Sequence, residues 1–198
     1  MRGYLKLNIT RYDEPTEWYH ITDVFTKAEL SIIDKFIPES SLEIHGKRSH
    51  NTNSRTFVNV NSPIQLLSVF DKFSEWQMMK IFSEITGVNC YNGKLRIELV
   101  NDEAGAHLDK HIDIKEKLIT FQVYINEGDK SWGTTIYKDW ETEHATIPFV
   151  RNTGWLTHKN VDTIHGIKEN NVTGQRHSVL INYIEGDWND TDQLFHLK

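Results

Sequence analysis

The second half of the chain is a series of short apolar segments separated by turns, and this pattern strongly limits the possible fold. Strands are predicted at residues 94–100, 117–125, 133–138, 153–157, 163–167 and 176–184. Polar, turn-forming runs such as 127–130 and 169–171 divide them. No helical segment alternates with these strands, as a parallel sheet would require. The pattern therefore predicts an antiparallel sandwich or jelly roll.

One of these segments, residues 117–125, indicates how the strands are oriented. Successive side chains of a strand point to opposite faces. One face of this segment is apolar and consists of Ile119, Phe121, Val123 and Ile125. The other face is more polar and consists of Leu118, Thr120, Gln122 and Tyr124. The polar face is therefore predicted to line the inside of the barrel.

The first half of the chain is predicted to be mainly helical. Residues 26–29 read Thr-Lys-Ala-Glu, a capping box that starts a helix predicted to stop at Pro38. A longer helix is predicted over residues 62–86, with Ser62 as its cap and Gly87 as its end.

The intervening residues, 39–61, are polar and are predicted to form a loop or two short strands. Their histidines, His45 and His50, have no carboxylate at strand spacing and are interpreted as solvated or substrate-loop residues. No linker divides the chain, so we expect one domain over residues 1–198. Its helical portion would span about 1–90, and its jelly-roll core would span about 91–186.

Composition excludes several classes of protein. The net charge is −6, and affinity for nucleic acid depends mostly on neutralising phosphates, so a nucleic-acid partner is not expected. No apolar run approaches the ~18 residues of a membrane span. A single cysteine, Cys90, allows no intramolecular disulfide. With no apolar leader at the N-terminus, a cytoplasmic location is expected.

A candidate metal site lies at residues 107–113, which read His-Leu-Asp-Lys-His-Ile-Asp. Residues two apart on a strand share a face, so His111 and Asp113 can reach one metal ion, and His165 on a later strand can supply a third ligand. Two imidazoles and one carboxylate suit ferrous iron and leave positions open for chemistry. The spacing argument also admits the pair His107 and Asp109. Strand alternation alone does not choose between the two pairs.

Arg176 follows His165 by 11 residues and lies at the start of the last long strand. Arg176 and Ser178 share a face of that strand. A guanidinium can bind a carboxylate through two parallel hydrogen bonds, so Arg176 could hold an acidic co-substrate beside the metal. A salt bridge from Arg176 to one of the chain's own carboxylates is the simpler structural interpretation.

Taken together, these motifs resemble the Fe(II)/2-oxoglutarate-dependent dioxygenase superfamily, and most closely its prolyl-hydroxylase-like branch. The resemblance rests on residues 105–113, 117–126, 133–134, 165–166 and 176–178. It covers roughly residues 95 to 184, whereas the helical N-terminal portion fits only loosely. In that family the His-x-Asp motif stands just before the next apolar strand, which favours His111 and Asp113. The implied fold is mainly β with flanking helices, a double-stranded β-helix or cupin-like jelly roll.

The resemblance also implies an activity. The chain would be a hydroxylase that uses Fe(II), 2-oxoglutarate and O₂, and releases succinate and CO₂. His111, Asp113 and His165 would hold the iron, and Arg176 and Ser178 would hold the far carboxylate of 2-oxoglutarate. Tyr124, Thr120 or Lys117 could also reach this co-substrate.

Other functions remain open on the sequence alone. The same ligand types occur in zinc hydrolases and cupin-type isomerases, and a binding module could keep the fold without catalysis. Arg176 discriminates among these, since a hydrolase has no need of a co-substrate clamp. The substrate is not identified, although Trp132, Trp140 and Trp155 could stack on a ring. A small molecule, a peptide or a protein side chain is expected, and the oligomeric state is not indicated.

Overall fold

The computed structural model describes residues 7–39, 53–186 and 188–195, which form two antiparallel sheets. The seven strands of the larger sheet are, in spatial order, β1 (Asn8–Tyr12), β2 (Trp18–Thr22), β9 (Thr153–His158), β6 (Lys117–Tyr124), β11 (Arg176–Ile184), β4 (Lys94–Asp102) and β3 (Asn53–Val58). Those of the smaller sheet are β5 (Leu108–His111), β10 (Ile164–Ile167), β7 (Thr135–Tyr137) and β8 (Glu143–Thr146). The predicted mainly-β jelly roll with flanking helices is confirmed.

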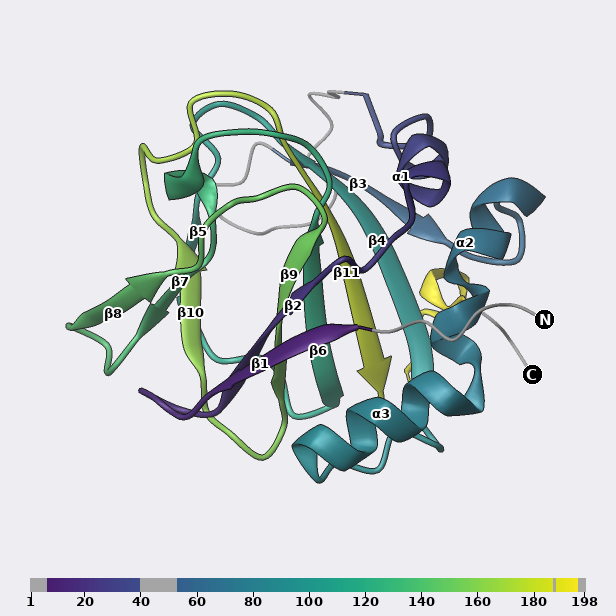
Figure 1. Ribbon diagram of the computed structural model, residues 1–198, viewed down its shortest axis with the longest axis horizontal. Coiled ribbons are helices and arrows are strands. Elements are labelled where there is room, and N and C mark those ends of the chain that lie inside the picture. The colour runs from purple at the N-terminus through teal and green to yellow at the C-terminus, as the bar shows by residue number, and fades with distance from the viewer. Residues whose placement is uncertain (1–6, 40–52, 187, 196–198) are drawn as a thin grey trace.

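Three helices cover the outer face of the larger sheet: α1 (Lys27–Ile33), α2 (Ile64–Ser74) and α3 (Trp76–Thr86). They lie on one side of that sheet, and the smaller sheet lies on the other (Figure 1). The main core is formed where the helices meet the sheet. There Phe73 and Phe82 both pack edge-on against Phe121, and Phe82 also packs edge-on against Tyr183. Phe70 packs against Phe73 with its ring tilted.

The inner face of the larger sheet is polar, and it faces the smaller sheet. On β6, Ile119, Phe121 and Val123 belong to the main core, as the alternation predicted. The intervening Thr120 and Gln122 are buried on the inner side. The fold therefore places apolar side chains in the main core on one face of the strands and polar side chains toward the smaller sheet on the other.

The N-terminal portion also contains three strands. β1 and β2 were not predicted, whereas β3 lies in the segment 39–61 that was predicted as a loop or two short strands. β1 and β2 extend one edge of the larger sheet, and β3 forms the other edge. β1 is almost entirely exposed, so it has no apolar alternation to reveal it. β3 is rich in polar residues because part of it faces the inner cavity. His45 and His50 lie outside the described residues.

The predicted helix over residues 62–86 is divided at Glu75, whose backbone is extended. An unbroken helix would direct Trp76, Lys80 and Glu84 toward the sheet after Phe73. The break rotates the second helix so that Met78 and Phe82 are buried instead.

Other helix ends agree with the sequence in part. The capping box of Thr26 and Glu29 is present, and Gly87 ends α3 with a φ of 66°. However, α1 ends at Ile33 rather than continuing to Pro38, and Ser62 does not cap α2. The Ser62 hydroxyl instead accepts a hydrogen bond from the backbone N–H of Asn59.

The segment after β11 folds back onto β4, beyond the point where the pairing of β4 with β3 ends. Leu194 forms a bridge with Arg96 of β4, and the backbone N–H of Phe195 donates to the carbonyl of Leu95. Both Leu194 and Phe195 are buried. None of the helices within the described residues is long and apolar enough to span a bilayer.

Candidate metal centre

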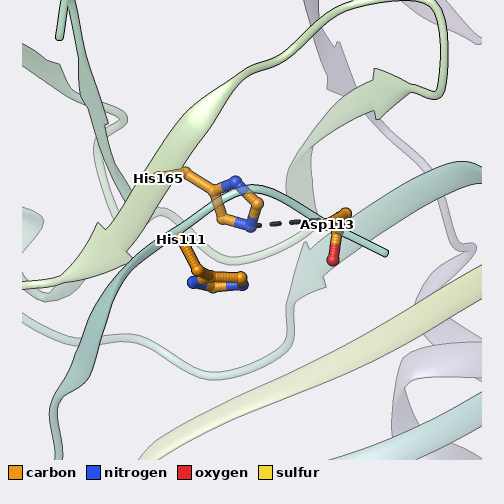
Figure 2. Close-up of side chains that lie close together, drawn as sticks. All are labelled: His111, Asp113 and His165. Carbon is orange, nitrogen blue, oxygen red and sulfur yellow. Dashed lines mark ion pairs between the residues drawn. The ribbon is translucent and has the colours of Figure 1, made fainter. Parts of the chain in front are cut away.

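The smaller sheet brings His111, Asp113 and His165 together. His111 is the last residue of β5 and lies opposite His165 of β10, while Asp113 follows two residues after β5 ends. One ligand atom from each residue lies within 4.8 Å of the other two. The two imidazole rings are 4.3 Å apart, and the Asp113 carboxylate lies beside the His165 ring (Figure 2). Residues that are 54 positions apart in the chain therefore meet at one point.

The backbone fixes the orientation of both imidazoles. The Nδ1 atom of His111 lies 2.9 Å from the carbonyl oxygen of Asp109, and that of His165 lies 2.9 Å from the carbonyl oxygen of Thr163. A carbonyl only accepts, so each Nδ1 carries a proton, and Nε2 is the nitrogen of each ring that can offer a lone pair to a metal. Burial lowers the pKa of His165 to about 4, which keeps this imidazole neutral at physiological pH.

Asp113 has one oxygen engaged and the other available. Its Oδ1 accepts a hydrogen bond of 2.5 Å from the Lys117 ammonium. Its buried Oδ2 accepts no hydrogen bond from the described residues and lies 4.0 Å from Nε2 of His165. Burial raises the pKa of Asp113, but the charges of Lys117 and His165 outweigh this effect and hold the pKa below its usual value. The centre thus offers one carboxylate oxygen and two imidazole nitrogens, a set that suits a divalent transition metal.

The alternative pair, His107 and Asp109, does not belong to this group of three ligands. Asp109 is exposed, and the His107 Nδ1 contacts the carbonyl oxygen of Gly105 at 3.4 Å. Within the part of the chain that the structure describes, only His111, Asp113 and His165 form a group of three such residues able to share one ion.

The three residues line a cavity of about 60 Å³ between the two sheets, and Arg176 lies in its wall. Arg176 is completely buried. Its Nη1 donates to Asp102 at 2.5 Å and its Nε donates to the carbonyl oxygen of Trp132 at 2.7 Å. Its Nη2 has no hydrogen-bond partner among the described residues. The salt bridge considered as the simpler interpretation is therefore present, and Nη2 alone, rather than a two-pronged fork, remains for a ligand.

The other predicted co-substrate residues take different positions. Thr120 lines the cavity and donates a hydrogen bond to Asn182. Ser178 accepts a hydrogen bond from the Gln122 amide, and neither Ser178 nor Tyr124 is among the lining residues. The Tyr124 hydroxyl interacts with Thr134 while its ring lies 5.3 Å from the Arg176 guanidinium. The structure thus brings Arg176 and Thr120 to the cavity and places Ser178 and Tyr124 behind its wall.

Of the three tryptophans considered for stacking, Trp155 is closest to the centre. Its ring packs edge-on against His165 at 4.9 Å, and its indole N–H donates to Gln122. It is almost completely buried and lines the cavity. Trp132 is partly buried behind Arg176, and Trp140 is exposed.

Sequence reasoning missed several cavity residues. Asp102, the partner of Arg176, lies opposite it across β4 and β11, a register that no local motif encodes. Arg55, Arg96 and Glu98 also line the cavity. Lys117 was considered as a contact for the co-substrate, but in the structure it contacts Asp113. Its position four residues after Asp113 was the available signal.

No protein-family model and no curated protein sequence matches this chain. Solved structures do match it. A prolyl-4-hydroxylase from Pseudomonas putida has a TM-score of 0.62 at 13% identity, over 86% of this chain and 93% of that one. The fold is that of the 2-oxoglutarate/Fe(II) oxygenases.

Two further structures with this oxygenase fold match at similar levels. A protein of the 2OG-Fe(II) oxygenase family from Burkholderia pseudomallei has a TM-score of 0.61 at 12% identity, over 84% of each chain. HygX from Streptomyces hygroscopicus, with nickel and 2-oxoglutarate bound, has a TM-score of 0.58 at 12% identity, over 86% of this chain and 84% of that one. The oxygenase fold thus extends over most of the chain.

Proposed function

We propose that this chain is a 2-oxoglutarate-dependent dioxygenase that binds Fe(II) through His111, Asp113 and His165 and oxidises a C–H bond of its substrate. The carrying observation is the convergence of these three residues on a cavity that also contains the buried, partly unpaired Arg176. The unpaired Oδ2 of Asp113 and the two Nε2 lone pairs fit a divalent metal. The substrate would be a small molecule, a peptide or a protein side chain.

Each residue has a role that follows from its contacts. The backbone carbonyls of Asp109 and Thr163 hold the two imidazoles with Nε2 directed to the centre. Bound Fe(II), 2-oxoglutarate and O₂ would together supply the oxidising chemistry, with succinate and CO₂ as co-products. The Arg176 Nη2 would donate to the far carboxylate of 2-oxoglutarate. Trp155 excludes water from the side of His165.

The decisive experiment combines a spectroscopic titration with an assay of turnover. Purified protein is loaded with Fe(II) without oxygen and titrated with 2-oxoglutarate, and we expect a weak visible charge-transfer band. Admission of air should then produce succinate. His165→Ala should abolish the band because one of the three ligands is lost, and Arg176→Gln should weaken 2-oxoglutarate binding while Fe(II) still binds.

The alternative pair supplies the matched control. The double variant with His107→Ala and Asp109→Ala removes the same residue types from the same segment and should keep both the band and the turnover. If this control abolished iron binding, or if iron-loaded protein gave no band with 2-oxoglutarate, the proposed activity would be wrong. Zinc-dependent hydrolysis without any use of 2-oxoglutarate would instead indicate the hydrolase alternative.

A further inference from the structure

A second charged cluster lies in the wall of the same cavity, on the edge strand β3 of the larger sheet and on its neighbour β4. Arg55 of β3 donates from Nη1 to one carboxylate oxygen of Glu98 at 2.8 Å, and Arg96 of β4 donates to the other oxygen at 2.5 Å. Glu98 is only 1% exposed. Two guanidinium groups therefore share one buried carboxylate, and these three side chains together carry one positive charge in excess.

The two arginines differ in how firmly they are held. The Nε of Arg96 donates to Gln193, and its guanidinium lies over the rings of both Phe57 and Trp188, 4.9 and 5.3 Å from their centroids. Arg96 is thus built into the wall as the counter-charge of Glu98. Arg55 has Glu98 as its only hydrogen-bond partner among the described residues, so its Nε and Nη2 donate to none of them.

Counted over the described residues that line it, the whole cavity also carries one positive charge in excess. Its cationic side chains are Arg55, Arg96, Lys117 and Arg176. Its carboxylates are Glu98, Asp102 and Asp113. A divalent metal and a dianionic co-substrate would cancel each other and leave this excess unchanged. A positive cavity in a chain with a net charge of −6 favours an anionic ligand.

This cluster is separate from the Arg176 end of the cavity. In the register between β11 and β4, Arg176 lies opposite Asp102. Glu98 lies opposite Leu180, which is four residues further along β11. At ~3.4 Å per residue the two pairs are about 14 Å apart. Arg55 of β3 lies opposite Val100 of β4, and its side chain extends toward Glu98, away from Arg176. A co-substrate held by Arg176 would therefore leave Arg55 unoccupied.

An open groove of about 540 Å³ adjoins the cavity and is lined in part by the same Arg96, His111 and Asp113. Leu108, Ile112 and Ile114 add apolar surface to this groove, and the latter two are exposed. An anionic group and an apolar body would thus both find a matching surface within reach of the metal centre.

We propose that Arg55 binds a carboxylate or phosphate of the substrate, and that the substrate is a small organic anion with an apolar portion. This inference rests on the proposed function, because it assigns the substrate class of the same site. The fixed Arg96 neutralises Glu98, so that Arg55 is available to the incoming anion.

The test measures binding without turnover. Protein loaded with Mn(II) and saturated with 2-oxoglutarate is titrated with hexanoate, with hexyl phosphate and with the neutral hexanamide, and ligand relaxation by Mn(II) is followed by NMR. We expect at least one anion to bind about tenfold more tightly than the amide, as a charge-assisted hydrogen bond would provide. The tighter of the two anions identifies the anionic group. The end of the chain far from the charge should be relaxed more strongly.

Three variants separate a contact with Arg55 from a general effect of charge. Arg55→Gln should remove the preference for the anion. Arg55→Gln combined with Glu98→Gln restores the net charge of the cavity and should still lack the preference. Arg151→Gln removes a surface arginine that pairs with Asp34 and should retain it.

Equal affinity for hexanamide and for both anions would overturn the proposal, as would recovery of the preference in the double variant. Either result, with normal Mn(II) and 2-oxoglutarate binding, leaves the proposed function intact. Failure to bind Mn(II) or 2-oxoglutarate at all would instead contradict the proposed function, and the substrate assignment with it.

Discussion

At the scale of single residues, Asp113 is held by a partner that leaves only one of its oxygens available. The Lys117 ammonium occupies Oδ1, and both side chains are only about 15% exposed. The carboxylate therefore presents Oδ2 toward His111 and His165 in a fixed orientation. Groups that orient a metal ligand in this way commonly contribute 10- to 100-fold to metal affinity, on the order of 1–3 kcal/mol.

We therefore expect Lys117→Met to weaken Fe(II) or Mn(II) binding by about tenfold or more. The reason is that Asp113 loses the hydrogen bond that orients it. Lys117→Arg should restore much of the affinity, and Lys115→Met, two residues away, should have little effect. The dissociation constant of Mn(II), measured by its EPR signal, checks this. Unchanged affinity in Lys117→Met would show that the ion pair has only a structural role.

The sequence predicted the residues of the centre better than their contacts. The spacing of His111 and Asp113 and the distal His165 were visible because strand alternation is a local property. The partners of Arg176 and Glu98 come from register between strands far apart in the chain, which no spacing encodes. For the same reason, the sequence left open whether Arg176 offers a two-pronged fork or a salt bridge to the chain itself, and Asp102 in fact occupies Nη1.

At the scale of elements, the centre depends on how closely β5 and β10 approach each other. Gly166 follows His165, and a Cβ atom at this position would lie 2.6 Å from the carbonyl oxygen of Leu108. The absence of a side chain thus permits the close pairing that places His165 opposite His111. A glycine in a strand often marks such an approach of two backbones.

Gly166→Ala is expected to separate β5 from β10 and to lower metal affinity, because the two imidazoles would move apart. The larger sheet and its helices should remain folded, since Gly166 lies outside the main core. Metal titration and circular dichroism of the same sample test both statements. Full metal affinity in the variant would show that β5 can shift without affecting the centre.

The prediction of elements succeeded where burial follows a simple period. The last long strand was predicted with its observed bounds, Arg176–Ile184. β1 and β8 were missed because they carry few alternating apolar residues, and β3 lies in a segment that was predicted as a loop or two short strands. The helix over 62–86 was predicted as continuous because a break at Glu75 carries no proline or glycine, and only the change of buried face requires it.

At the scale of the whole molecule, buried histidines link stability to pH. His158 at the end of β9 is only 6% exposed, and burial lowers its pKa although Glu17 lies 3.1 Å away. Burial also lowers the pKa values of His20 and His177. As pH falls through the usual histidine range near ~6.5, the unfolded chain binds protons first. Folded stability is therefore expected to decrease in that range.

His158→Gln should reduce this dependence, because one group no longer takes up a proton on unfolding. We expect the melting temperature of the metal-free variant to fall less than that of the parent protein between pH 7.5 and about pH 5. His144→Gln on β8 serves as the matched control. An identical pH dependence in the His158 variant and the parent would contradict this explanation.

The polar inner face of the larger sheet has a consequence for how the chain can vary. Along β11, Val179 and Ile181 belong to the main core, while Ser178 and Asn182 are buried on the opposite side. Neighbouring residues of one strand therefore have separate roles: one stabilises the fold, and the next lines the side of the sheet where the chemistry takes place. Such a strand can diverge in what it recognises without losing its shape, a freedom consistent with neighbours of 12–13% identity that retain the same architecture.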